Sequence, residues 1–166
     1  TVCDDEPNPI NQDGLFDFDT STFLSTIIGA QTGVNVYYYD ENNVLIPSPT
    51  PNQLPNPFRT ATQNVKVIVE NPINPTCTAE ITIPFIVHPT PKIDQEETVI
   101  ICLPDTQASI DAGILDGTPT TNYSYQWFFN NAIISGETNY TLTVNTPGIY
   151  SVIVTNAFNC SKTRTI

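Results

Sequence analysis

Apolar and polar residues alternate with a period of two along much of the first half of the chain. This alternation puts the apolar side chains on one face of an extended strand. The stretch Ser21–Ile28 is the one helix candidate, with Thr20 or Ser21 as its N-cap and Gly29 at its end. The pattern predicts strands at residues 15–19, 34–39, 44–46, 65–70 and 78–87.

The second half contains shorter strand candidates separated by turn sequences at Asp116-Gly117, Asn130-Asn131 and Pro147-Gly148. About seven short strands at this spacing are typical of an immunoglobulin-like sandwich. Trp127 is then the expected core residue of its strand, and Tyr150 occupies the place of a tyrosine corner. The predicted strands are residues 99–103, 107–112, 123–129, 132–135, 140–144, 149–155 and 163–166.

A proline-containing linker at residues 87–91 separates the two halves, and two X-Pro steps favour an extended, semi-rigid connection there. Twelve of the fifteen prolines precede residue 92, so the halves also differ in composition. We therefore expect an all-β protein of two tandem β-sandwich domains. The first, residues 1–88, is acidic and has one short helix, and the second, residues 89–166, is Ig-like.

The formal net charge of −12 narrows the choice of partners. Nucleic acid and anionic membranes bind cation-rich surfaces, whereas this chain has only five Lys and Arg residues. No apolar run approaches the roughly 20 residues that span a bilayer. The chain begins at Thr1 without a leader pattern, so we expect a mature or excised piece with no membrane insertion in this segment.

The four cysteines, Cys3, Cys77, Cys102 and Cys160, include no CxxC pair, which disfavours a zinc ribbon or a redox motif. Four cysteines allow three pairings. Cys3–Cys77 with Cys102–Cys160 is the pairing that respects the domain boundary. Each bond would contribute roughly 4 kcal/mol in the chain-entropy model and would indicate an oxidising compartment. The alternative is reduced, buried thiols.

Two groups of motifs resemble repeats of large Bacteroidetes surface proteins. Gly148–Cys160, Ser124–Trp127 and Cys102 resemble Ig-like and PKD-like modules, although the acidic PKD pattern is missing. In the first half, Cys3-Asp4-Asp5 and the stretch from Asp13 to Asp19 resemble the repeat found beside those modules, together with residues 33–39, 57–58, 67–71 and Cys77. The resemblance implies an outer-membrane-associated cell-surface protein exported by the type IX secretion system of flavobacteria, such as a gliding-motility adhesin. It also implies neighbouring repeats of the same polypeptide as partners.

Acidic residues are densest near the N-terminus, and they form a candidate calcium site. Calcium prefers six to eight hard oxygen ligands, and close carboxylates repel each other without a cation. The spacing does not match an EF-hand, and a solvated acidic loop is the alternative. The candidate ligands are Asp4, Asp5, Glu6, Asn11, Asp13 and Asp17, with Asp19 nearby.

Tyr37, Tyr38 and Tyr39 form a candidate platform for stacking on sugar, with an edge or inter-domain contact as the alternative. His88 is the only histidine, and we interpret it as a linker side chain because no nucleophile motif accompanies it. A paired-carboxylate glycosidase needs no histidine, but two small domains leave little room for a cleft. We expect no enzyme.

The sequence thus predicts an extracellular adhesin segment that acts as a stalk and a weak binding module. Surface polysaccharide is a candidate partner, and calcium is the one candidate cofactor. The main alternative is a carbohydrate-binding or accessory module of a secreted hydrolase. A passive spacer is the third interpretation.

Overall fold

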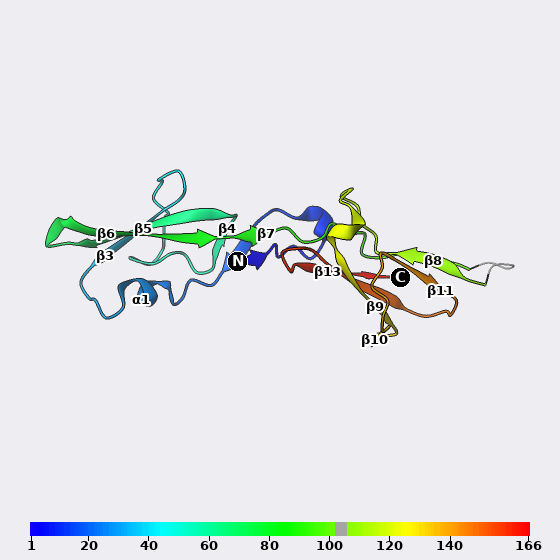
Figure 1. Ribbon diagram of the computed structural model, residues 1–166. Helices are drawn as coiled ribbons and strands as arrows, with labels where there is room; N and C mark the ends of the chain where they lie inside the picture. The colour runs from blue at the N-terminus through cyan, green and yellow to red at the C-terminus, as the bar shows by residue number, and fades with distance from the viewer. Residues whose placement is uncertain (102–105) are drawn as a thin grey trace. The chain divides into compact units, whose positions relative to one another are not determined.

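The computed structural model describes residues 1–101 and 106–166 (Figure 1). Strands make up 41% of the structure and helices 7%, which confirms the predicted all-β class. The chain divides into two compact units. The first comprises residues 1–5 and 14–88, and the second comprises residues 6–13 and 89–166. The N-terminal segment 6–13 therefore groups with the second unit, whereas the sequence placed it in the first domain.

The first unit is built from three small sheets and one helix. A parallel pair joins β1 to β7, an antiparallel pair joins β2 to β4, and the antiparallel order β3-β5-β6 forms the largest sheet. The elements are β1 (Val2–Cys3), β2 (Phe16–Phe18), α1 (Phe23–Ile28), β3 (Asn35–Tyr39), β4 (Phe58–Thr60), β5 (Gln63–Asn71), β6 (Asn74–Phe85) and β7 (Val87–His88).

The core of the first unit gathers around Phe85 at the end of β6. The rings of Phe18 and Phe58 meet Phe85 edge-on, at centroid distances of 4.8 and 5.2 Å, and Phe23 of α1 stacks on it at 5.9 Å. Such aromatic contacts add to the free energy of apolar burial. The inward row of β5, Val65 and Val67, is fully buried and continues the core along the sheet. β6 is largely exposed before Ile83 and forms one edge of that sheet.

The predicted helix exists, but its N-terminus differs from the prediction. Thr22 is the N-cap and makes no side-chain capping bond. Thr20, an expected cap, is buried instead, and its hydroxyl donates to the Pro55 carbonyl at 2.7 Å. Gly29 ends the helix as predicted, because its φ of 57° suits glycine and its N–H donates to the Ser25 carbonyl.

The predicted strand at residues 44–46 is reduced to a single bridge between Tyr39 and Leu45. Asp40 organises a tight turn here, since its carboxylate accepts the backbone N–H groups of Asn42 and Val44 at 2.9 and 2.8 Å. Pro47 follows directly, and a proline cannot donate to a strand ladder. The strand pairing at residues 44–46 is therefore limited to this one bridge.

The second unit is a two-layer β-structure. One layer has the order β10-β9-β12-β13, and the other is the antiparallel pair β11-β8. Both layers contribute side chains to one apolar core, as a β-sandwich requires. The elements are η1 (Pro9–Asn11), β8 (Ala108–Asp111), η2 (Thr120–Asn122), β9 (Ser124–Phe129), β10 (Ala132–Ile133), β11 (Thr141–Val144), β12 (Tyr150–Thr155) and β13 (Ser161–Thr165).

The predicted aromatic core residues of this unit are confirmed. Trp127 is fully buried, and its indole N–H donates to the Asn139 carbonyl at 2.9 Å. The Tyr150 hydroxyl donates to the carbonyl of Thr146, four residues upstream, at 3.0 Å, which is the hydrogen bond of a tyrosine corner. Burial raises the pKa of Tyr125 to about 12, and its hydroxyl donates to the Thr120 carbonyl.

Residues 99–101, the described part of the predicted strand 99–103, form no strand, and residues 102 and 103 lie outside the described residues. The preceding segment is held instead by Arg164 of β13. This buried guanidinium donates to the Asp94 carbonyl at 2.8 Å and pairs with the carboxylates of Asp94 and Glu97. A buried charge is tolerated only when it is paired in this way. Gly113 is necessary beside it, because a Cβ there would lie 2.6 Å from Arg164 Nη1.

Hydrogen bonds explain why segment 6–13 groups with the second unit. The Gln12 side chain accepts the Thr90 N–H at 2.7 Å and donates to the Thr90 carbonyl at 3.0 Å. Lys162 of β13 donates to the carbonyls of Glu6 and Pro7. The chain therefore passes from the first unit to the second after Asp5, returns after Asp13, and crosses again after His88.

Val152→Ala tests whether the Trp127 core stabilises the second unit. Val152 is fully buried, so the loss of two methyl groups and the residual cavity should lower the free energy of unfolding by about 2 kcal/mol. Trp127 is the only tryptophan, so urea unfolding followed by its fluorescence reports on this unit. The exposed Ile149→Ala is the matched control and should change stability by less than about 0.5 kcal/mol. Equal effects of the two substitutions would contradict this description of the core.

Candidate functional site

Cys3 and Cys160 form a disulfide. Cys77 is a free, exposed thiol, and Cys102 lies outside the described residues. The expected pairs Cys3–Cys77 and Cys102–Cys160 are therefore wrong. Cys3 lies on β1 beside His88, whereas roughly 25 Å of extended β6 separates Cys77 from Phe85. A disulfide requires Cα atoms within about 7 Å.

Backbone pairing places Cys3. β1 is only two residues long, and Val2 and Cys3 lie in parallel register with Val87 and His88. The Val2 N–H donates to the Ile86 carbonyl at 2.9 Å, and the Asp4 N–H donates to the His88 carbonyl at 2.8 Å. His88, expected as a linker side chain, is thus the last residue of β7.

A turn organised by Asn156 places Cys160. The Asn156 side chain accepts the N–H groups of Phe158 and Cys160 at 3.0 and 3.1 Å, and its amide donates to the Pro89 carbonyl at 2.8 Å. Asn159 takes the left-handed conformation, with φ at 66°, which asparagine tolerates better than most residues. The turn leaves Cys160 only 1% exposed. Because thiol–disulfide exchange requires access to a sulfur atom, this burial protects the bond on the Cys160 side.

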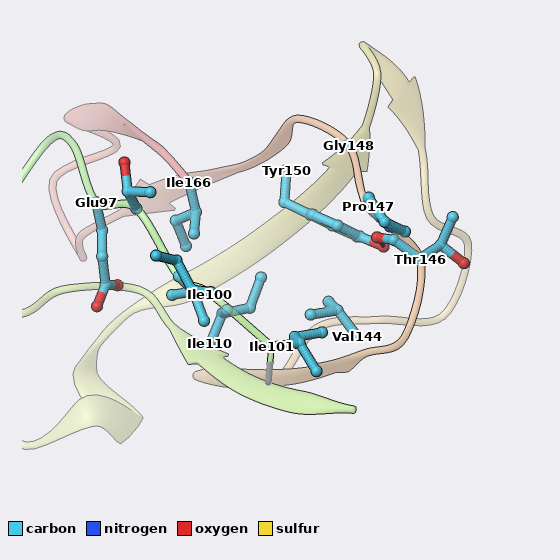
Figure 2. Close-up of a pocket in the computed structure, with 12 residues that line it drawn as sticks. Glu97, Ile100, Ile101, Ile110, Val144, Thr146, Pro147, Gly148, Tyr150 and Ile166 are labelled. Atoms are coloured by element: carbon cyan, nitrogen blue, oxygen red, sulfur yellow. Dashed lines mark hydrogen bonds between the residues drawn. The ribbon is translucent and has the colours of Figure 1, made fainter. Parts of the chain in front are cut away.

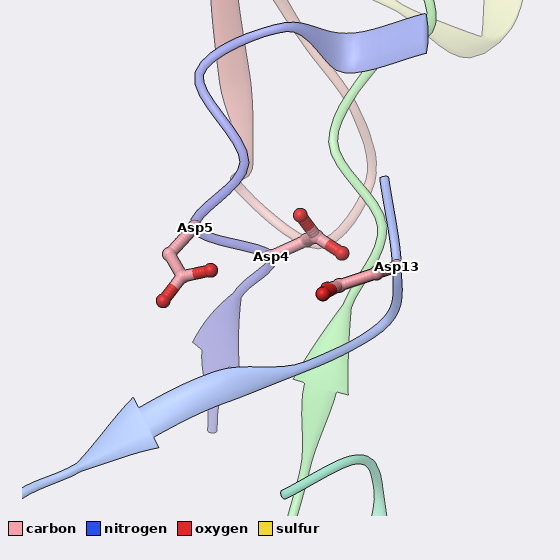
Figure 3. A group of neighbouring side chains, drawn as sticks. All are labelled: Asp4, Asp5 and Asp13. Atoms are coloured by element: carbon pink, nitrogen blue, oxygen red, sulfur yellow. The ribbon is translucent and has the colours of Figure 1, made fainter. Parts of the chain in front are cut away.

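The predicted calcium ligands separate into two groups. Asp4, Asp5 and Asp13 each offer a carboxylate oxygen, and these three atoms lie within 4.8 Å of one another (Figure 3). Asp4 is buried and accepts the Gly14 N–H at 2.7 Å. The other predicted carboxylate ligands, Glu6 and Asp17, are not members of this cluster, and the sixth predicted ligand is the amide Asn11.

The cluster has a cation partner within the protein itself. Arg59 of β4 pairs with Asp5 and with Asp17, each at 3.3 Å. All three side chains are substantially exposed, so each pair contributes at most about 1 kcal/mol. Calcium binding stays a prediction, and Asp4, Asp5 and Asp13 are the predicted carboxylate ligands that lie together.

The three consecutive tyrosines do not form one platform. Tyr38 points into the core, is 2% exposed and donates its hydroxyl to the Asn52 carbonyl at 3.2 Å, and burial raises its pKa. Tyr37 and Tyr39 lie half-buried on the opposite face of β3, an edge strand. The ammonium of Lys66 lies 5.3 Å from the centre of the Tyr39 ring. Tyr37 and Tyr38 are among the residues that line a groove.

That groove, of about 420 Å³, runs between β3 and the proline-rich segment 45–53. Tyr37, Asn35 and Gln53 are among its lining residues and supply an aromatic ring and amide groups. Asn52 fixes the far wall, because its side chain accepts the Val36 N–H of the β3 edge at 2.9 Å. Sequence reasoning found Tyr37 but missed the amides, which no pattern distinguishes from ordinary loop residues.

A second groove, of about 390 Å³, lies in the second unit (Figure 2). Its lining is mainly aliphatic and includes Ile101, Ile110 and Val144. Its ionisable members are Glu97 and Tyr150, and both are already engaged, with Arg164 and with the Thr146 carbonyl.

Residues 1–91 match the family model described as "Flavobacterium inter-domain disulphide bond domain". No curated protein matches the chain. Among solved structures, the chain is similar to SGBP-B of the Bacteroides ovatus mixed-linkage glucan utilization locus, in complex with a mixed-linkage heptasaccharide. That likeness has 15% identity and a TM-score of 0.31, and it covers 82% of this chain and 36% of the SGBP-B chain. Across the described residues, no helix combines the length and the apolarity needed to cross a membrane.

The calcium prediction is tested by thermal unfolding with and without the ion. Calcium binding to the cluster should relieve the repulsion between its carboxylates. Because calcium would then bind the folded state and not the unfolded chain, it should raise the melting temperature by mass action. Asp13→Asn should abolish this increase. Asp17→Asn is the matched control, since Asp17 lies outside the cluster, and it should retain the increase. An unchanged melting temperature of the wild-type protein in saturating calcium would refute the hypothesis.

Proposed function

We propose that this chain, which belongs to the Flavobacterium inter-domain disulphide bond domain family, is an extracellular segment of a cell-surface adhesin that serves as a stalk and a weak binding module without catalytic activity. The observation that carries the proposal is the Cys3–Cys160 disulfide. Structural disulfides persist in oxidising compartments and are rare in the cytosol. The bond therefore supports a position at the cell surface.

The span of the disulfide suits a structural segment. It closes a loop of 157 residue steps (160 minus 3), which contributes about 5 kcal/mol in the chain-entropy model. Each unit has a modest core, and small domains of this kind commonly depend on covalent bonds. A stalk needs such stability, because it must keep its folded dimensions outside the cell.

The surface charge favours weak, multivalent binding to neutral partners. A net charge of −12 disfavours polyanions, whereas a neutral polysaccharide meets no such repulsion. Weak contacts repeated along one polypeptide add through effective concentration. Export by type IX secretion and a part in gliding belong to the same proposal, and the motifs Gly148–Cys160 and Cys3-Asp4-Asp5 support them through the resemblance.

A second candidate function is carbohydrate binding as an accessory module of a secreted hydrolase. The groove beside β3 favours it, because its lining includes the aromatic residue Tyr37 and the amide residues Asn35 and Gln53. An aromatic ring with a few polar groups is a common lining of small-ligand sites. The main proposal requires no specific contact at this groove, which separates the two candidates.

Replacement of the segment in its parent protein distinguishes these functions. Deletion of residues 1–166 should weaken attachment of the cells to a surface, because the adhesive end loses reach. Insertion of two unrelated β-sandwich domains of matched length should restore most of the attachment if the segment is a stalk. Failure of deletion to change attachment would contradict the proposal.

Tyr37→Ala in the otherwise intact segment is the second arm of this experiment, with Tyr37→Phe as its matched control. A stalk should tolerate both substitutions. Loss of attachment and of polysaccharide binding in Tyr37→Ala, with retention in Tyr37→Phe, would favour the carbohydrate-binding function instead.

A further inference from the structure

We infer that the Cys3–Cys160 disulfide diverts tension around both folded units, so that the segment transmits a pull without unfolding. The diversion of tension requires only the disulfide, and its biological use in a stalk rests on the proposed function. Any pull that enters before Cys3 and leaves after Cys160 follows the shortest covalent path, which is the sulfur–sulfur bond. Residues 4–159, which hold nearly all of both units, lie outside that path.

The length removed from the load path is large. The loop of 157 residue steps would extend to roughly 520–570 Å at about 3.3–3.6 Å per residue. None of this length is available to an external force while the disulfide is intact. The segment therefore keeps its length even under a force that would unfold either unit in an open chain.

The strand that follows Cys160 has little slack. β13 begins one residue after Cys160, is already extended and pairs with β12 over five residues, from Ser161 to Thr165. A strand that is already extended lengthens very little under tension.

Arg164 anchors this loaded strand. Its buried guanidinium pairs with Asp94 and Glu97, which lie inside the unloaded loop. Lys162 adds bonds to the carbonyls of Glu6 and Pro7, also inside the loop. Residues outside the load path thus hold the strand that carries the tension.

An open chain would be weak at its first strand. Without the disulfide, the pull would enter the first unit through β1, which has only two register pairs with β7. Two such pairs can separate one after the other, so the first unit would open readily. The disulfide acts at Cys3, the last residue of that same strand, and removes the load from it.

Single-molecule force spectroscopy on the full 166-residue chain, placed between marker domains, tests this inference. The oxidised wild-type chain should show unfolding of the markers alone, with less than about 50 Å released from the segment. The Cys3→Ser/Cys160→Ser variant should release on the order of 500 Å more, in one or two steps. Cys77→Ser/Cys102→Ser is the matched control and should behave as the wild type.

Two further measurements keep the test decisive if the open variant folds poorly. Trp127 fluorescence shows whether the second unit is folded before the pull. A dithiol reductant, added while the wild-type chain is held under force, reduces the bond to two thiols and is itself oxidised to a disulfide. Release of the hidden length should follow.

A segment that releases hundreds of ångströms while mass spectrometry shows an intact Cys3–Cys160 bond would overturn the inference. An open or reduced chain that releases no additional length would overturn it as well. Failure of the stalk proposal in the attachment experiment would leave these force traces unchanged, so the two failures are distinguishable.

Discussion

A disulfide between residues 3 and 160 closes 157 residue steps of a 166-residue chain into one covalent loop. Two features of the chain depend on this constraint. The first strand, β1, is too short to be stable by itself, yet the bond fixes its last residue. The last strand, β13, begins one residue after the bond, so its start is fixed as well. The loop entropy removed from the unfolded chain stabilises both units.

Hydrogen bonds near each cysteine fix the backbone position of that cysteine. The Asn156 side chain sets the turn that holds Cys160, and the ladder between β1 and β7 sets Cys3. Segment 6–13 groups with the second unit, so the chain passes between the units three times. Gln12 and Lys162 hold segment 6–13 in the second unit through bonds to backbone carbonyl groups, which any residue can supply. No side-chain pattern in the sequence therefore indicates that segment 6–13 belongs to the second unit.

Much of the fold could be predicted because it depends on local periodicity. The strands around Trp127 and Tyr150 follow from alternation and turn residues, and so does the end of α1 at Gly29. The cysteine pairing could not be predicted in this way, because the expectation assumes one bond within each domain. The pairing of Cys3 depends on which strand β1 joins, and a strand of two residues is too short for its sequence pattern to identify its partner.

The candidate sites show the same limit. Three of the predicted acidic ligands lie together, two of them directly after β1 and the third at Asp13, whereas Asp17 pairs with Arg59 on a neighbouring strand. Alternation along β3 places Tyr38 on the opposite face from Tyr37 and Tyr39. It did not identify which face is buried, because that depends on the packing of Phe85 and α1 across the sheet.

The most direct test of the central constraint is a disulfide map of the oxidised protein after its free thiols are blocked at low pH. Cleavage after Lys, Arg and Glu places each cysteine in its own fragment, with Cys77 in 71–80, Cys102 in 98–137 and Cys160 in 138–162. We expect the N-terminal fragment with Cys3 to be linked to 138–162, and fragment 71–80 to carry a blocked thiol. A link from Cys3 to 71–80 or to 98–137 would contradict this pairing.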